Sequence, residues 1–151
     1  MRYHVLGFAI AASLTTVPAF AATPEVAMAK ECGACHMVYP ASQLPARSWT
    51  ALMASLGNHF GENAALDSAT TKQIADLLTT TAADAAGRNN RALRGLSATQ
   101  TPLRITETPY WISKHGQGRV AATALAAVKA KSASDCVACH AGASSGQFDD
   151  D

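Results

Sequence analysis

CGACH at residues 32–36 and CVACH at residues 136–140 are the stretches that decide the fold, and together they contain all four cysteines of the chain. Cys-x-x-Cys-His is the pattern by which haem c is attached to a protein. The two thiols, on one helical turn, can each bond a vinyl-derived carbon of one porphyrin, and the histidine that follows reaches the iron as proximal ligand. The sequence therefore predicts two covalently bound haems c. The predicted attachment residues are Cys32, Cys35, Cys136 and Cys139, and the predicted proximal ligands are His36 and His140.

Three other uses of paired cysteines compete with haem attachment. Cysteines in an oxidising compartment form disulfides. A Cys-x-x-Cys pair near a βαβ pattern indicates a redox dithiol, but no such pattern surrounds either motif. Two sets of Cys, Cys and His are also compatible with zinc. None of these alternatives explains why a histidine follows the second cysteine both times, so haem attachment is the favoured interpretation.

The second axial position of each iron is assigned by elimination. In cytochromes c it holds a methionine or a second histidine, and an open position is typical of ligand binding or catalysis. The chain has five histidines; His4 is lost with the N-terminal leader described below, and His36 and His140 are proximal. His59 and His115 remain for two irons, and we predict both as distal ligands. Chain order pairs His59 with His36 and His115 with His140, and a crossed arrangement stays open.

The methionines of the mature chain are poorer candidates for the distal position. Met37 directly follows a proximal ligand, so it cannot reach the opposite face of the same haem. Met53 lies with Trp49 and Leu52 on the i, i+3, i+4 pattern of a helix face that packs in a core. Met28 precedes the first motif on what we expect to be the same helix, and therefore lies on the proximal side.

Residues 1–21 have the layout of a secretory signal peptide. Arg2 precedes an apolar run of ten residues, Val5–Leu14, and Ala19-Phe20-Ala21 provides an Ala-x-Ala cleavage site. The run is too short to span a bilayer, which takes about 20 residues. We therefore expect cleavage after Ala21 or Ala22, export to the periplasm, and no transmembrane segment in the mature protein.

Charge is balanced over the whole chain but unevenly distributed along it. Twelve Lys and Arg face eleven Asp and Glu, a net charge of +1, which gives no case for a nucleic-acid partner. Between residues 88 and 119, Glu107 is the single acid, and the basic residues are Arg88, Arg91, Arg94, Arg104, Lys114 and Arg119. This segment is an ordinary solvated linker, or its arginines pair with haem propionates, or it docks an acidic partner.

The pattern along the chain is helical nearly throughout and predicts an all-α protein with two small haem-binding units. We expect the signal peptide at 1–21, a first haem c unit at 22–86, and a second haem c unit at 87–151 that includes the basic linker and an acidic tail. Expected helices of the first unit run from Pro24 into the first motif, from Pro45 to about Leu56, and from Asp67 or Ser68 to near Gly87. Those of the second unit are a turn at Thr108–Trp111, a helix over 117–131, and a short last helix capped by Ser134 or Asp135.

Four further stretches make the chain resemble the small dihaem cytochromes c, the DHC family. They are Leu44-Pro45-Ala46-Arg47-Ser48-Trp49, His59-Phe60-Gly61, Thr108-Pro109-Tyr110-Trp111 and His115-Gly116. The resemblance implies a periplasmic electron carrier with two low-spin, bis-histidine haems, ligated by His36, His59, His115 and His140. It also implies a first unit like a small monohaem cytochrome c and a shorter, less regular second unit.

The resemblance implies redox partners as well. Such proteins pass electrons from a membrane b-type cytochrome, the donor, to a small monohaem cytochrome c that binds oxygen, the acceptor. We therefore expect an electron carrier and not an enzyme. The alternatives are a small dihaem enzyme of the peroxide reductase type and a haem-based gas-binding protein, both of which need an open or dissociable axial position.

Overall fold

The computed structural model describes residues 22–85, 90–116 and 118–148. Within these ranges the chain forms helices and turns but no strand, apart from a single bridge between His59 and Glu62, so the predicted all-α fold is confirmed. The predicted signal peptide at 1–21 and acidic tail at 149–151 lie outside the described residues, as does Arg88. In the part of the chain that is described, no helix is long and apolar enough to cross a membrane.

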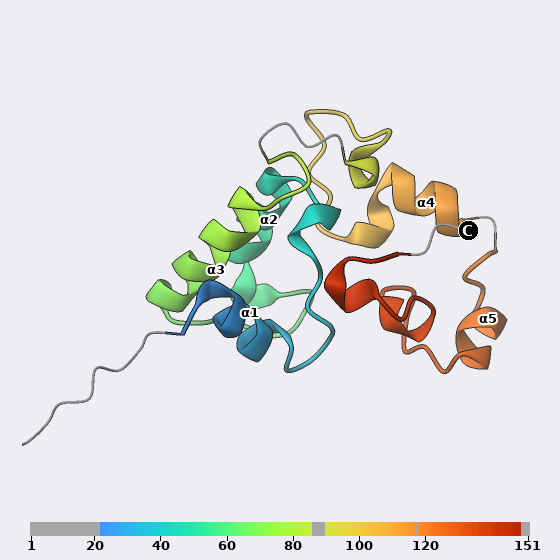
Figure 1. The fold of residues 1–151 in the computed structure, drawn as a ribbon, viewed down its shortest axis with the longest axis horizontal. Helices are drawn as coiled ribbons and strands as arrows, with labels where there is room; N and C mark the ends of the chain where they lie inside the picture. Colours follow the sequence, from blue (N-terminus) through green and yellow to red (C-terminus); the bar gives the residue numbers. More distant parts are fainter. Residues whose placement is uncertain (1–21, 86–89, 117, 149–151) are drawn as a thin grey trace, which may run out of the picture.

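Three helices pack together on one side of the molecule (Figure 1). They are α1 (Pro24–Cys32), α2 (Ala46–Ala54) and α3 (Ser68–Thr80). On the other side lie α4 (Pro109–His115) and α5 (Ala122–Ala127). Short 3-10 helices at Ala41–Gln43, Leu56–Asn58, Arg91–Leu93, Ile105–Glu107, Cys136–Ala138 and Ala143–Ser145 join these elements. The division into units at 22–86 and 87–151 stays a prediction.

The core lies between the first three helices. Ile74 of α3 is fully buried, and Leu44, which precedes α2, is 1% exposed. Trp49 and Met53 of α2 are buried against them, which confirms that Met53 is a core residue. The indole of Trp49 donates a hydrogen bond to the carbonyl of Ala41 at 2.8 Å, so the ring is fixed as well as buried. The helix-face pattern in the sequence therefore indicated the core correctly.

The starts of the helices agree with the sequence better than their ends. Thr23 caps α1 through a 3.4 Å hydrogen bond from the Val26 N–H, and Asp67 caps α3 by accepting from two backbone N–H groups. However, α1 ends at Cys32, so Cys35 and His36 lie in the turn after the helix. The prediction that both thiols of the first motif share one helical turn was therefore wrong.

The third helix is also shorter than predicted, because its C-terminal threonines compete for its own carbonyls. The hydroxyls of Thr80 and Thr81 donate to the carbonyls of Asp76 and Leu77, both at 2.6 Å. Such local side-chain bonds offer the backbone an alternative to the helical ladder. The helix accordingly ends at Thr80 and not near residue 87.

The helices of the second half differ more from expectation. The predicted turn at 108–111 continues as α4 to His115, whereas the helix predicted over 117–131 is limited to Ala122–Ala127. Lys129 has a φ of 56°, and the next N–H, of Ala130, reaches back to the Leu125 carbonyl at 2.9 Å. A left-handed residue with such a back-bond ends a helix. The last predicted helix is a 3-10 turn, and Asp135 makes no cap there.

The segment predicted as a linker is held against the first three helices. Arg47 of α2 donates to the carbonyls of Gln100 at 2.6 Å and Ser97 at 3.0 Å, and also pairs with Asp84 at 3.5 Å. The side chain of Asn90 donates to the Ser42 carbonyl at 2.6 Å. The segment therefore lies along the first half of the chain and is held there by these hydrogen bonds.

Replacing Ile74 by Ala tests whether this core supports the fold. The side chain is fully buried in α3, and its truncation leaves a cavity that costs about 2–5 kcal/mol. Urea unfolding of the holoprotein should therefore show a free energy of unfolding lower by this amount. Lys72→Ala, on the exposed side of the same helix, is the control and should cost about 0.5 kcal/mol or less. Equal effects of the two variants would contradict the proposed core.

Candidate functional site

The first candidate site brings together His36 and His59. His36 lies in the turn after α1, and His59 directly follows the 3-10 helix Leu56–Asn58. Their ring centres are 6.2 Å apart, and the ring planes differ by 29°. One predicted proximal and one predicted distal residue therefore face each other, although 22 residues separate them in the chain.

The second candidate site brings together His115 and His140. His115 is the last residue of α4, and His140 follows the 3-10 helix Cys136–Ala138. Their ring centres are 6.0 Å apart, with the planes nearly perpendicular at 82°. The structure thus contains two separate histidine pairs, each including the histidine of one CxxCH motif.

These separations fit an iron atom between the rings of each pair. Metal–imidazole bonds are about 2 Å long, and each ring centre lies about 1 Å beyond its ligating nitrogen, so two axial imidazoles have centres roughly 6 Å apart. The observed values, 6.2 and 6.0 Å, match this requirement. Both pairs therefore have the spacing that axial ligation of one haem iron demands.

Backbone carbonyls hold the outer nitrogen of one histidine in each pair. Nδ1 of His36 donates to the Met37 carbonyl at 2.6 Å, and Nδ1 of His115 donates to the Trp111 carbonyl at 3.2 Å. A carbonyl can only accept, so each ring carries its proton on Nδ1 and leaves Nε2 free for a metal. Metal-binding histidines commonly have this second hydrogen bond, which orients the ring.

His59 is presented by a tight turn with an unusual backbone. Its N–H donates to the Glu62 carbonyl at 2.7 Å, and the Glu62 N–H returns a bond to His59 at 3.2 Å. Between them, Phe60 and Gly61 have φ values of 56° and 101°, the pattern of a type I′ turn. A bulky residue at positive φ is strained, and here the Arg104 guanidinium, 3.8 Å above the Phe60 ring, covers it.

His115 is presented by the start of its own helix. Thr108, which is buried, caps α4 by accepting from the Trp111 N–H at 3.2 Å, and Pro109 occupies the first helical position. Trp111 and His115 are four residues apart and so lie on the same helix face. Their rings stack with centres 4.7 Å apart and planes at 14°. The cap therefore sets the direction of the helix, and the tryptophan sets the ring of His115.

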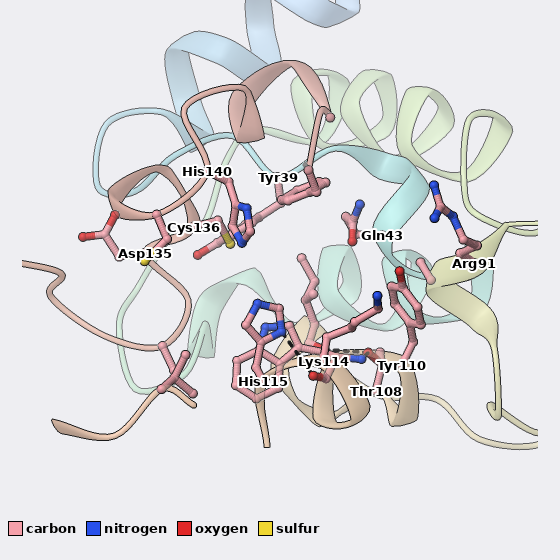
Figure 2. Close-up of a pocket in the computed structure, with 18 of the residues that line it drawn as sticks. Tyr39, Gln43, Arg91, Thr108, Tyr110, Lys114, His115, Asp135, Cys136 and His140 are labelled. Carbon is pink, nitrogen blue, oxygen red and sulfur yellow. Dashed lines mark hydrogen bonds between the residues drawn. The ribbon is translucent and has the colours of Figure 1, made fainter. Parts of the chain in front are cut away.

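A cavity of about 460 Å³ opens at the second pair. Figure 2 shows Tyr39, Cys136 and His140 on one side of it, and His115 and Lys114 on the other. Its volume lies within the ordinary range for cofactor sites. The cavity thus separates the second attachment motif from the α4 histidine, as a planar group bound between them requires.

All four cysteines are free of disulfides. In each motif the first cysteine, Cys32 or Cys136, is half-buried and the second is exposed, and burial raises the pKa of both half-buried thiols. Among the described residues, no three His, Cys, Asp or Glu side chains gather into a cluster that could hold a metal ion. Neither the disulfide nor the zinc interpretation of the motifs is therefore supported.

Both predicted distal histidines are kept neutral. Burial, followed by the charges of His36 and Arg104, lowers the pKa of His59. Burial also lowers the pKa of His115, against the hydrogen bond to Trp111, which raises it. Nδ1 of His59 is buried without a hydrogen-bond partner among the described residues. Neutral imidazole is the form that binds a metal, so both sites suit a haem iron.

The basic segment divides between the two sites. Arg91, Lys114 and Arg119 line the cavity at the second pair. Arg104 instead stacks on Phe60 beside the first pair. The hypothesis that these cations pair with propionates stays a prediction, but the structure brings three of them to one cavity.

Sequence reasoning missed the aromatic neighbours of the histidines. Trp111 stacks on His115, and Phe148 meets the His140 ring edge-on with centres 5.7 Å apart. The spacing of four residues between Trp111 and His115 was a usable signal. Phe148 gave no such signal, because its contact depends on how the last segment folds back.

The comparisons with known proteins agree with this arrangement. A family model described as dihaem cytochrome c matches residues 28–148. A solved diheme cytochrome c from Rhodobacter sphaeroides is 53% identical, with a TM-score of 0.73, over 81% of this chain and 94% of that one. A diheme cytochrome type c from Shewanella baltica is 36% identical, with a TM-score of 0.63, over 85% of this chain and 89% of that one. No curated protein matches.

Replacing Gly61 by Ala tests the turn that presents His59. Gly61 has a φ of 101° with open space around it, so an added methyl group meets no atom but imposes the backbone cost of a left-handed residue, about 1–2 kcal/mol. We expect a free energy of unfolding lower by this amount in urea titrations of the holoprotein.

Gly57→Ala is the matched control for this substitution. Gly57 also has open space around it but no positive φ, so we expect its replacement to change stability by less than about 1 kcal/mol, in the stabilising direction. If both variants behave alike, the turn does not require glycine at residue 61.

Proposed function

The chain belongs to the dihaem cytochrome c family and carries two covalently attached haems c, and we propose that it is a periplasmic electron carrier with bis-histidine ligation at both irons. His36 and His59 ligate the first iron, and His140 and His115 ligate the second. The single observation that carries this proposal is the spacing of the two pairs, 6.2 and 6.0 Å between ring centres, because it fits two axial imidazoles and leaves no room for a substrate between them.

The residues around each pair support transfer of an electron without other chemistry. When bound, haem c supplies an iron that alternates between the ferric and ferrous states. The carbonyls of Met37 and Trp111 hold the imidazoles of His36 and His115 in one orientation, and preorganised ligands lower the cost of changing redox state. Trp111 covers His115 and so limits access of water to that ring.

Export and partners are proposed from the sequence. The signal-peptide pattern at residues 1–21 supports secretion across the inner membrane. The protein would then work in the periplasm, which is an oxidising compartment. By resemblance, we propose a membrane b-type cytochrome as electron donor and a small monohaem cytochrome c as acceptor. The three cations at the cavity, Arg91, Lys114 and Arg119, suit an acidic partner surface, whose attraction decreases as salt screens it.

Electron paramagnetic resonance of the oxidised holoprotein is the experiment that tests this function. Two low-spin ferric haems, and a ferrous protein that does not bind carbon monoxide rapidly, are the expected results. A high-spin haem of full intensity, or rapid carbon monoxide binding, would contradict the proposal. Those results would favour the dihaem enzyme or the gas-binding protein, which need an open axial position.

Replacing one distal histidine should open one haem. In His59→Ala and in His115→Ala we expect a high-spin signal equal to one haem of the two, because each pair contains one distal histidine and no second one. Electron paramagnetic resonance and the high-spin absorption band measure this fraction. Met53→Leu is the control, since Met53 is a core residue, and it should stay low-spin. A fully low-spin His59→Ala would show that another group is the ligand.

The reduction potentials of the two haems should be low and unequal. Axial methionine raises the potential of a cytochrome c relative to axial histidine, and neither proposed pair contains methionine. The pairs differ in their neighbours, with Phe60 beside His59 and Trp111 beside His115, so one common potential is not expected. A redox titration followed by optical absorption measures both. A value typical of Met/His cytochromes for either haem would contradict the assignment.

A further inference from the structure

Tyr39 connects two parts of the chain that are far apart in sequence. Its ring lies against the first site, with its centre 5.1 Å from that of His36. Its hydroxyl donates a hydrogen bond to the Ser134 carbonyl at 2.9 Å, across 95 residues of sequence. No local sequence pattern joins these two positions, so this connection is a finding of the tertiary structure.

The far end of this connection is the second attachment motif. Ser134 lies two residues before Cys136, and the Cys136 thiol is 3.5 Å from the same carbonyl oxygen that Tyr39 binds. Tyr39 also lines the cavity of the second site together with Cys136 and His140 (Figure 2). One side chain therefore contacts the proximal histidine of the first site and the backbone that carries the cysteines of the second.

Pro40, the next residue, also lies against the C-terminal part of the chain. Pro40 lies beside Gly146, close enough that a Cβ built on Gly146 would be 3.6 Å from the proline ring. Tyr39 itself packs against the core of the first three helices. The residues 39–40 are thus held by the core on one side and contact the last segment at two points on the other.

The hydroxyl of Tyr39 is suited to a permanent donor role. The side chain is half-buried, and its hydroxyl is the donor in the 2.9 Å bond to the Ser134 carbonyl. The acceptor is a backbone carbonyl, which has no titration of its own. The bond therefore joins a hydroxyl donor to a backbone acceptor and does not depend on a charged partner.

We propose that Tyr39 is a positioning residue that fixes the second haem site against the first and thereby sets the rate at which an electron passes between the two haems. The proposal rests on the electron-carrier function proposed above. Electron tunnelling falls steeply with distance and depends on orientation, so a side chain that holds one site against the other affects its rate. Nothing in the ligation of either iron requires this tyrosine, which makes its role separable by substitution.

Tyr39→Phe in the holoprotein removes the hydroxyl and keeps the ring, and Tyr39→Leu removes both. Ser134→Ala is the control, because it changes the same loop but leaves the carbonyl that Tyr39 binds. In hydrogen-exchange measurements, we expect amide protection around residues 132–140 to fall about threefold to tenfold in Tyr39→Phe, the range for loss of one ordinary hydrogen bond. Ser134→Ala removes only the exposed hydrogen bond between the Ser132 and Ser134 hydroxyls, so it should lower protection less than Tyr39→Phe does.

A second measurement separates positioning from simple support. Flash reduction of the holoprotein, followed by absorption, gives the rate of electron exchange between the haems, and electron paramagnetic resonance gives their mutual magnetic coupling. We expect slower exchange and weaker coupling in Tyr39→Phe, a larger loss in Tyr39→Leu, and unchanged low-spin ligation in both.

Three outcomes would overturn the proposal. Unchanged protection and unchanged exchange in Tyr39→Phe would show that the bond has no role. Reduced protection with wild-type exchange and coupling would show structural support only. If the wild type shows no electron exchange between its haems, the role proposed for Tyr39 is wrong, because there is no transfer for it to control. If the wild type exchanges electrons normally and the Tyr39 variants do too, only the role of Tyr39 is wrong.

Discussion

The pairing of two histidine rings at each proposed haem site is the constraint on which the rest of this structure depends. An iron with two imidazole ligands needs two rings on opposite sides, with centres roughly 6 Å apart, and the chain meets this requirement twice. In each pair, one ring belongs to a CxxCH motif and is carried along with the cysteines. The other comes from a separate element, the turn at His59 or the end of α4 at His115, and the folding of the first half and the capping of α4 serve to bring these two rings to their partners.

The two halves of the chain meet the constraint by different means. The first half has a protein core, with Leu44 and Ile74 almost fully buried between helices. In residues 118–148, which the structure describes, Ala143 alone is buried. A segment with so little core of its own depends on other contacts, and a haem attached there gives it apolar surface to pack against. The hydrogen bond from Tyr39 to Ser134 adds a direct connection to the better-packed half.

Strain and its compensation lie beside a functional residue. Phe60 adopts a left-handed backbone next to His59, and Arg104 from the wrapped segment covers its ring at 3.8 Å. Arg47 holds the same segment through the carbonyls of Ser97 and Gln100. The segment that looked like a linker thus supports the turn that presents His59, and basic residues between 88 and 119 lie beside both sites.

By itself, the sequence determined the features that depend on local chemistry. The two motifs indicated the haems, the count of histidines left His59 and His115 for the distal positions, and Asp67 and Thr108 marked helix starts that the structure contains. Those signals work because attachment, capping and helix-face patterns involve residues a few positions apart. Only the tertiary structure decided where helices end, which aromatic rings cover the histidines, and that Tyr39 reaches Ser134. These features depend on contacts between residues up to 95 positions apart. Such contacts form only when the whole chain packs, so no short stretch of sequence predicts them.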